Sequence, residues 1–118
     1  MLVVDETLVS RSKGDIAEQK ACEYLLSQGF KIIEQNFYAK KLGEIDIIAT
    51  KEEVYHFCEV KSGTDYESAV NNLTPSKLSK IKRSTDYYLQ SKKLDVIYCI
   101  DALIVVDNDI EFLENITF

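Results

Sequence analysis

The chain has 118 residues, of which 46% are apolar and 29% charged, and its formal net charge is −6. One proline and four glycines leave little material for linkers or disorder, so we expect a single domain over residues 1–118, with residues 1–10 as a candidate N-terminal extension. The net negative charge argues against unaided, sequence-independent binding to a polyanion, because lysine and arginine contacts with phosphates dominate such affinity.

The first predicted element is a helix that runs from Ser10-Arg11-Ser12, whose serines offer N-cap hydroxyls, to about Gln28. Apolar residues recur there at helical spacing, namely Ala17, Ala21, Tyr24 and Leu25, and Gly29 supplies the stop. Residues 30–36 then alternate apolar and polar side chains, which predicts a strand, and a turn follows at residues 40–43.

Two further strands are predicted at residues 44–49 and 54–61, on either side of a tight polar turn at residues 51–53. These two strands should form a hairpin. Residues 62–73 have no clear period, so they are expected to form a loop or a loose turn of helix.

A second helix begins where Thr74 offers an N-cap and Pro75 a first helical residue, and it runs to about Lys92. Residues 95–106 are apolar and β-branched, as in a strand buried on both faces, and a short strand follows at residues 110–113.

The predicted order of elements is therefore α-β-β-β-α-β-β. Strands joined by short turns pair as antiparallel neighbours, whereas a strand–helix–strand connection implies a right-handed parallel crossover. We expect an α/β (α+β) fold in which a mixed β-sheet carries a helix on each face.

The beginning of the chain lacks the basic n-region of a secretory signal, and no apolar run approaches the roughly 18 residues that cross a bilayer. We expect a cytoplasmic protein without membrane contact.

The cysteines and the lone histidine give no sign of a site. Cys22, Cys58 and Cys99 are odd in number and far apart, which favours buried free thiols over disulfides or a metal clip. His56 is assigned no role, because the sequence offers it no partner for a zinc site or a nucleophilic triad.

The strongest candidate for chemistry lies in the hairpin. If its turn centres on Glu52 and Glu53, facing residues have numbers that sum to 105, which places Asp46 opposite Glu59. The Cβ atoms of such a pair are about 4.5–5.5 Å apart, and Lys61 shares the face of Glu59 because side chains alternate along a strand. Two opposed carboxylates repel each other, so a cation bound between them would be favourable, and Mg²⁺ or Mn²⁺ is the expected cofactor.

A divalent ion at this place could polarise a phosphodiester and supply a hydroxide nucleophile. Lys61 could orient or deprotonate the attacking water, or neutralise charge on phosphorus. Glu18, at the edge of the first helix's apolar stripe, is a candidate third metal ligand. The alternative is that Asp46 ends the hairpin, that Glu59 and Lys61 form a solvated ion pair worth under about 1 kcal/mol, and that Glu18 is an ordinary flanking residue.

Positive charge is gathered in one segment. Residues 77–93 hold six basic residues and one acid, a local charge of +5 against −11 for the remainder of the chain. Lys77, Lys80 and Arg83 of the second helix are therefore candidate nucleic-acid contacts, although a solvated helix face has the same composition.

Several motifs are familiar in their order and spacing: Gly14-x-x-Ala17-Glu18, Tyr24-Leu25, Gly29-Phe30, Gly43-Glu44-Ile45-Asp46-Ile47-Ile48-Ala49, Glu59-Val60-Lys61 and Thr74-Pro75-x-Lys77. Together they resemble the YraN-like family of small bacterial proteins, which belongs to the Holliday-junction-resolvase-like branch of the PD-(D/E)XK nucleases. The resemblance covers about residues 12–116.

This resemblance implies a restriction-endonuclease-like mixed sheet and a Mg²⁺- or Mn²⁺-dependent endonuclease that cuts DNA, with branched DNA such as Holliday junctions as a candidate substrate. On the family pattern Glu18, Asp46 and Glu59 are the acidic metal-site positions. Lys61 matches the catalytic lysine, and Lys77 matches a basic position on the second helix. A homodimer would suit a junction resolvase, since a two-fold axis matches two symmetric cuts.

Two departures from the family pattern remove positive charge. Relatives usually carry an arginine where this chain has Ser62-Gly63-Thr64, and another before the position of Ile100-Asp101-Ala102. They support an alternative function, a catalytically weak or inactive nuclease-fold module that binds nucleic acid or a protein partner.

Overall fold

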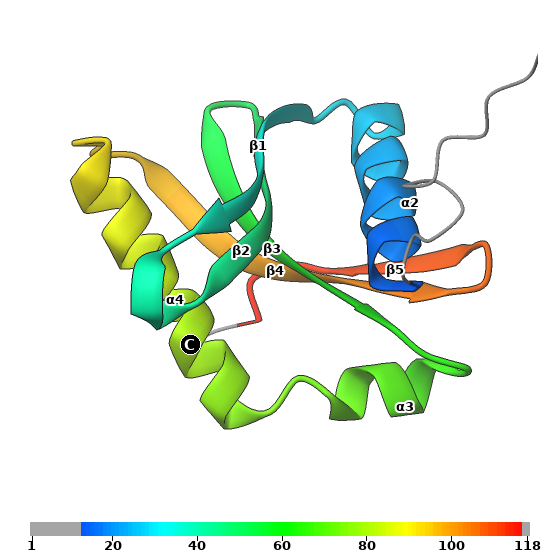
Figure 1. Ribbon diagram of the computed structural model, residues 1–118. Helices are drawn as coiled ribbons and strands as arrows, with labels where there is room; N and C mark the ends of the chain where they lie inside the picture. The colour runs from blue at the N-terminus through cyan, green and yellow to red at the C-terminus, as the bar shows by residue number, and fades with distance from the viewer. Residues whose placement is uncertain (1–12, 117–118) are drawn as a thin grey trace, which may run out of the picture.

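The computed structural model describes residues 13–116, in which a five-stranded mixed sheet carries helices against both faces (Figure 1). In chain order the elements are α2 (Lys13–Ser27), β1 (Lys31–Tyr38), the short 3₁₀ helix η1 (Lys40–Leu42), β2 (Glu44–Lys51), β3 (Val54–Ser62), α3 (Tyr66–Asn71), α4 (Pro75–Ser91), β4 (Ile97–Val106) and β5 (Asp109–Leu113). The predicted fold class is confirmed. No described helix is long and apolar enough to cross a membrane.

The strands lie in the order β1-β2-β3-β4-β5. β1 with β2, β2 with β3, and β4 with β5 are antiparallel pairs, whereas β3 and β4 are parallel and joined through α3 and α4. The predicted antiparallel neighbours and parallel crossover are therefore both confirmed. β4 is an interior strand, and its residues 100–105 are buried on both faces, which explains why all of them except Asp101 are apolar.

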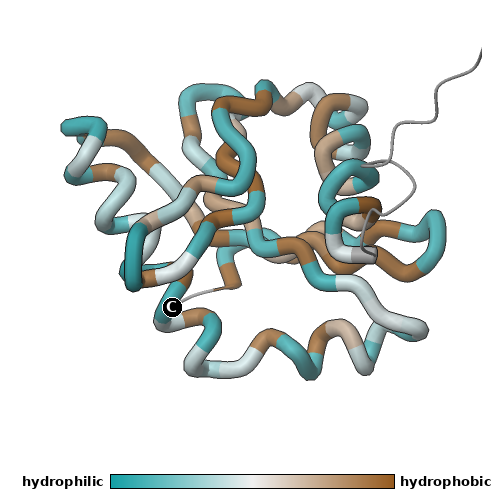
Figure 2. Tube along the Cα trace, in the orientation of Figure 1, coloured by the Kyte–Doolittle hydropathy of each residue, from teal (hydrophilic) through white to brown (hydrophobic). Residues whose placement is uncertain are grey.

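The two long helices bury separate cores on opposite faces of the sheet. On one face Ala21 and Leu25 of α2 pack with Ile47 and Leu103. On the other face Ile81 and Tyr88 of α4 pack with Ile48 and Phe57. Figure 2 shows the corresponding pattern along the chain, with apolar stretches on the central strands and a hydrophilic turn between β4 and β5.

The predicted helix boundaries are set by identifiable caps. Gly29 adopts a left-handed φ of 90° after α2, and the N–H of Phe30 returns to the carbonyl of Leu25 at 2.9 Å. The hydroxyl of Thr74 accepts the backbone N–H of Lys77 at 3.3 Å, as predicted for the N-cap of α4. The N-cap expected at residues 10–12 and the candidate N-terminal extension lie outside the described residues.

Residues 62–73, which were expected to form a loop or a loose turn of helix, contain the short helix α3. α3 forms because the carboxylate of Asp65 accepts the backbone N–H of Ser68 at 2.9 Å, which caps a helix too short to show a period. Ala69 buries against Ala102 and Ile104 and fixes α3 on the sheet.

Candidate metal centre

The predicted hairpin register is confirmed, and it ends at the candidate site. The β2–β3 ladder runs from Lys51 opposite Val54 to Ile47 opposite Cys58, so every pair sums to 105. The ladder stops one pair short of Asp46 and Glu59.

Beyond the last pair of the ladder, the side chain of Asp46 takes the place of a backbone acceptor on β2. Asp46 Oδ2 accepts the backbone N–H of Val60 at 2.8 Å. A backbone donor at the end of a ladder needs an acceptor, and the carboxylate provides one. Asp46 is thereby held against β3 by its side chain rather than by strand pairing.

Glu59 and Lys61 share one face of β3, as their spacing predicted. Lys61 Nζ lies 3.0 Å from Glu59 Oε1, and the two side chains are 22% and 14% exposed for Lys61 and Glu59 respectively. The pair is thus largely withdrawn from solvent, which makes its geometry more defined than that of an ordinary surface ion pair.

Glu18 extends from the half-buried edge of α2 toward β1, where Asn36 Nδ2 donates a hydrogen bond to Glu18 Oε1 at 2.7 Å. Asn36 has a left-handed φ of 51°, a conformation that asparagine tolerates better than most residues. It lies between the paired positions Gln35↔Ile47 and Phe37↔Ile45, and therefore across from Asp46. Asn36 was not predicted from the sequence, where its one signal was an asparagine at the end of the strand expected over residues 30–36.

The pKa of Asp46 depends on the charges of Glu18, Glu59 and Lys61, so these four residues form one electrostatically coupled site. Burial, followed by the charge of Glu59, raises the pKa of Asp46 to about 8. The hydrogen bond from Val60 opposes the rise, the charge of Glu18 adds to it and the charge of Lys61 subtracts from it. The carboxylate is therefore difficult to ionise without a further cation.

Glu18 lies in the same field. Burial raises its pKa, the hydrogen bond from Asn36 lowers it, and the charges of Glu44, Asp15 and Glu59 raise it. Three acids from three different elements thus act on one another, and a cation among them would relieve both raised pKa values.

The three carboxylates do not form a closed cage. Among the described residues, the group of histidine, cysteine and acidic side chains whose ligand atoms all lie within 4.8 Å of one another is a different one, His56 with Cys99 and Asp101. An open set of oxygen ligands suits Mg²⁺ or Mn²⁺, which keep several positions for water and substrate phosphate. The donor chemistry therefore fits such an ion at Glu18, Asp46 and Glu59.

The prediction that His56 has no partner is wrong. His56 Nδ1 lies 2.6 Å from Asp101 Oδ2 and 3.1 Å from the Cys99 sulfur. Both partners come from β4, more than forty residues along the chain, and the sequence alone does not give the register between β3 and β4.

The positive charge of α4 is extended by a second element. Lys77, Lys80 and Arg83 are exposed on α4, as predicted. Gly43, next to η1, packs so closely on α4 that an added Cβ would lie 3.4 Å from Ser84 Oγ. The exposed Lys40 and Lys41 of η1 therefore join this face, and Lys40 Nζ lies 6.0 Å from the centre of the Tyr87 ring. We call the following five residues the basic surface: Lys40, Lys41, Lys77, Lys80 and Arg83.

A family model described as "Uncharacterised protein family UPF0102" matches residues 17–105. The chain belongs to the UPF0102 family. The matched span contains all seven site residues predicted from the sequence, and the family is the one that the YraN-like motifs indicated.

UPF0102 proteins from several bacteria are similar to the chain over most of its length. The protein from Aliarcobacter butzleri is 62% identical over 92% of this chain and 99% of that protein. The protein from Sulfurimonas denitrificans is 54% identical over the same shares. The protein from Helicobacter pylori strain HPAG1 is 50% identical over 92% of this chain and 93% of that protein.

Proposed function

We propose that the protein is a Mg²⁺- or Mn²⁺-dependent endonuclease that hydrolyses phosphodiester bonds in DNA, with branched DNA as its preferred substrate class. Glu18, Asp46 and Glu59 hold the metal, and Lys61 is the catalytic lysine. The observation that carries the proposal is the largely buried carboxylate of Asp46, whose pKa is raised by burial and by Glu59, beside the 3.0 Å ion pair of Glu59 and Lys61.

The chemistry of the donors favours a divalent ion. Two ionised carboxylates withdrawn from water repel each other, and a single lysine offsets only part of their charge. When bound, the ion supplies Lewis-acid activation of the phosphodiester and of the attacking water. The protein contributes the arrangement of side chains that receives the phosphodiester and the attacking water.

Each residue has a distinct part in that arrangement. The N–H of Val60 fixes the direction of the Asp46 carboxylate. Glu59 holds the ammonium of Lys61, which is 22% exposed and therefore reachable from solvent. From there Lys61 orients the attacking water or neutralises the charge that develops on phosphorus. Asn36 positions Glu18 through the 2.7 Å hydrogen bond.

The charge distribution supports DNA as the substrate. The basic surface gathers five cations on α4 and η1, and η1 leads through Gly43 directly into the strand that carries Asp46. Phosphates held there would enter the site from the η1 side, while the acidic remainder of the chain repels DNA elsewhere. A homodimer would present two such sites across a two-fold axis, as two symmetric cuts in a junction require.

A second function is supported by the net charge of −6 and by the neutral residues at positions 62–64 and 100. It is a nuclease-fold module that binds nucleic acid or a protein partner without cutting it. Such a module would lose DNA binding when the basic surface is reversed in charge and would be indifferent to Asp46→Asn.

The test is a titration of Mg²⁺ and Mn²⁺ against the wild type and Asp46→Asn, with melting temperature and cleavage of a four-way junction read in parallel. Glu23→Gln is the matched control, because it likewise turns a carboxylate into an amide, but at an exposed acid of α2 that is not a proposed metal ligand. Stabilisation and cutting in the wild type and in Glu23→Gln, but not in Asp46→Asn, support the enzyme. Stabilisation with DNA binding but no cutting supports the module, and no response to metal refutes the metal centre.

A further inference from the structure

The fold assembles a second cluster of ligand-type side chains on the α2 side of the sheet. In the parallel pairing of β3 with β4, His56 lies opposite Cys99, and Asp101 follows two residues later on the same face as Cys99. His56 Nδ1 is 2.6 Å from Asp101 Oδ2 and 3.1 Å from Cys99 Sγ. Asp101 is fully buried, His56 is 6% exposed and Cys99 is half-buried.

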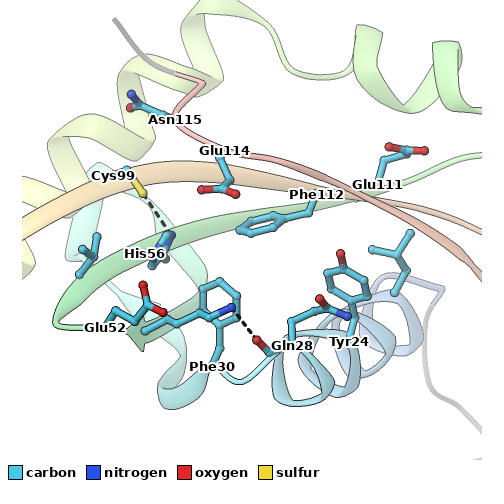
Figure 3. Close-up of a pocket in the computed structure, with 13 residues that line it drawn as sticks. Tyr24, Gln28, Phe30, Glu52, His56, Cys99, Glu111, Phe112, Glu114 and Asn115 are labelled. Carbon is cyan, nitrogen blue, oxygen red and sulfur yellow. Dashed lines mark hydrogen bonds between the residues drawn. The ribbon is translucent and has the colours of Figure 1, made fainter.

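This cluster is separate from the candidate metal centre. His56 and Glu59 are an odd number of positions apart on β3, so their side chains emerge on opposite faces of the strand. The cluster instead adjoins a hollow of about 760 Å³, whose lining includes none of the predicted site residues. Figure 3 shows His56 and Cys99 in contact there, with the Phe30 and Phe112 rings beside them.

The surroundings fix the ligands in place. The ring of Phe30 meets the His56 imidazole edge-on at 5.0 Å between centroids. Asp101 Oδ1 accepts the backbone N–H of Asn115 at 2.8 Å, so the carboxylate is oriented by the segment after β5. An outer hydrogen bond of this kind, which orients a ligating carboxylate, is a regular part of metal sites. Glu114 reaches over the same hollow, and its charge acts on the Cys99 thiol.

The donor set differs in kind from that of the first site. Imidazole nitrogen, thiolate sulfur and carboxylate oxygen together suit a borderline ion, whereas Mg²⁺ requires oxygen ligands. We propose that His56, Cys99 and Asp101 bind Zn²⁺, with the fourth coordination position facing the hollow, where water or Glu114 completes a tetrahedral set. The site is independent of the proposed nuclease function.

The distances allow this with a small adjustment. Zinc bond lengths of about 2.0–2.3 Å and tetrahedral angles place the ligand atoms about 3.3–3.6 Å apart. The observed separations of 2.6 and 3.1 Å are shorter, because hydrogen bonds now join the three groups. On binding, the ion takes the place of the thiol proton, which passes to water. The imidazole ligates through Nδ1 in its neutral form, with its one proton on Nε2, and the ligands move apart by less than about 1 Å.

Cobalt(II) is the probe, because it occupies zinc sites and reports its ligands spectroscopically. One Co²⁺ bound to the full chain should show a thiolate-to-cobalt charge-transfer band and tetrahedral visible bands, whether or not a second Co²⁺ occupies the candidate metal centre, and Zn²⁺ should remove both kinds of band. Cys99→Ser should abolish the charge-transfer band. Cys22→Ser, a matched change at another cysteine on the α2 face, should keep it, as should Asp46→Asn. Absence of the band in the wild type, or its persistence in Cys99→Ser, overturns the proposal.

A measurement on the wild type alone guards against a variant that misfolds. Zn²⁺ at ten times its dissociation constant should slow alkylation of Cys99 about tenfold, because only the unbound fraction reacts. The rate is followed by mass spectrometry of the labelled peptides, which separates Cys99 from the buried Cys22 and Cys58. An unchanged rate at saturating Zn²⁺ would show that His56 and Asp101 are a metal-free structural pair.

Discussion

Asp46→Asn should stabilise the metal-free protein at alkaline pH. The substitution removes the charge of a largely buried carboxylate and retains a side-chain oxygen that can accept the N–H of Val60. The hydrogen bond at the end of the β2–β3 ladder is therefore kept, while the repulsion from Glu59 and the desolvation of the charge disappear. A merely structural aspartate on a strand would give the opposite result.

The sign follows from the raised pKa. The folded state holds a proton on Asp46 up to a pKa of about 8, whereas the unfolded chain loses it near the ordinary value of about 4. The contribution of Asp46 to stability is therefore complete below about pH 4 and is lost progressively as the pH rises through about 8. The amide that replaces the carboxylate in the variant cannot titrate, so the difference between variant and wild type should grow over this range.

The magnitude can be bounded. One pKa unit corresponds to about 1.4 kcal/mol, so a rise of about four units gives an upper limit of about 6 kcal/mol. Because Glu59 shares the charge of the site, we expect about half of that limit, roughly 2–3 kcal/mol at pH 8.5, or about 10 °C in melting temperature for a chain of this size.

The assay is urea and thermal unfolding from pH 5 to 9 in the presence of a chelator. Glu111→Gln serves as the control, because Glu111 is an exposed acid on β5, a strand that holds none of the proposed metal ligands. Saturating Mg²⁺ should restore wild-type stability at pH 8.5 and leave Asp46→Asn unchanged. If the wild type and Asp46→Asn lose stability in parallel, or if the variant is the less stable at pH 8.5, the account of this carboxylate is wrong.

Three further predictions concern catalysis, the hairpin turn and DNA binding. Lys61→Met should abolish metal-dependent cleavage and keep the metal-induced rise in melting temperature, since lysine is not a metal ligand; a retained cleavage rate would exclude Lys61 from the chemistry. Both turn residues Glu52 and Glu53 have positive φ values, 52° and 67°, so the double change to Asn-Gly should stabilise the protein by about 1 kcal/mol, whereas a lower melting temperature would contradict the turn geometry. Changing Lys80 and Arg83 to Glu should weaken DNA binding and flatten its dependence on salt, which is measured by fluorescence anisotropy, and an unchanged salt slope would place the contact elsewhere.

The DNA-binding prediction has its own control. Lys31→Glu alters an exposed lysine at the start of β1, away from α4 and η1, and gives the same change in charge per residue. It should affect binding much less than a substitution on the basic surface. Equal losses at both places would indicate a response to net charge alone.

Local patterns predicted most of the fold. The 2.0-residue alternation and the two-residue turn at Glu52 and Glu53 determined the hairpin register, and with it the shared face of Glu59 and Lys61. The helix caps at Gly29 and Thr74 could likewise be predicted from the sequence, because a cap depends only on neighbours within a few residues.

Contacts between distant segments were not predictable in the same way. The bond from Asp46 to Val60 arises because the β2–β3 ladder stops, and alternation carries no signal for where a ladder ends. The contact between His56 and Asp101 depends on the register of a parallel pair joined through α3 and α4, a connection whose length sets no register. The sequence therefore gave no indication that Cys99 and Asp101 lie beside His56.

The register of β3 has a consequence for how this chain tolerates insertions. Its odd-numbered residues 57, 59 and 61 alternate with 56, 58 and 60, so one extra residue in the Glu52–Glu53 turn would invert every side chain of the strand relative to β2. Glu59 and Lys61 would then face the α2 core, and His56 would leave Cys99. A single residue added to the turn would thus separate the residues of both clusters, although the turn lies at the opposite end of the β2–β3 ladder from Asp46. Length variation in this protein is far better accommodated between α3 and α4, where the parallel crossover does not transmit a shift to the strands.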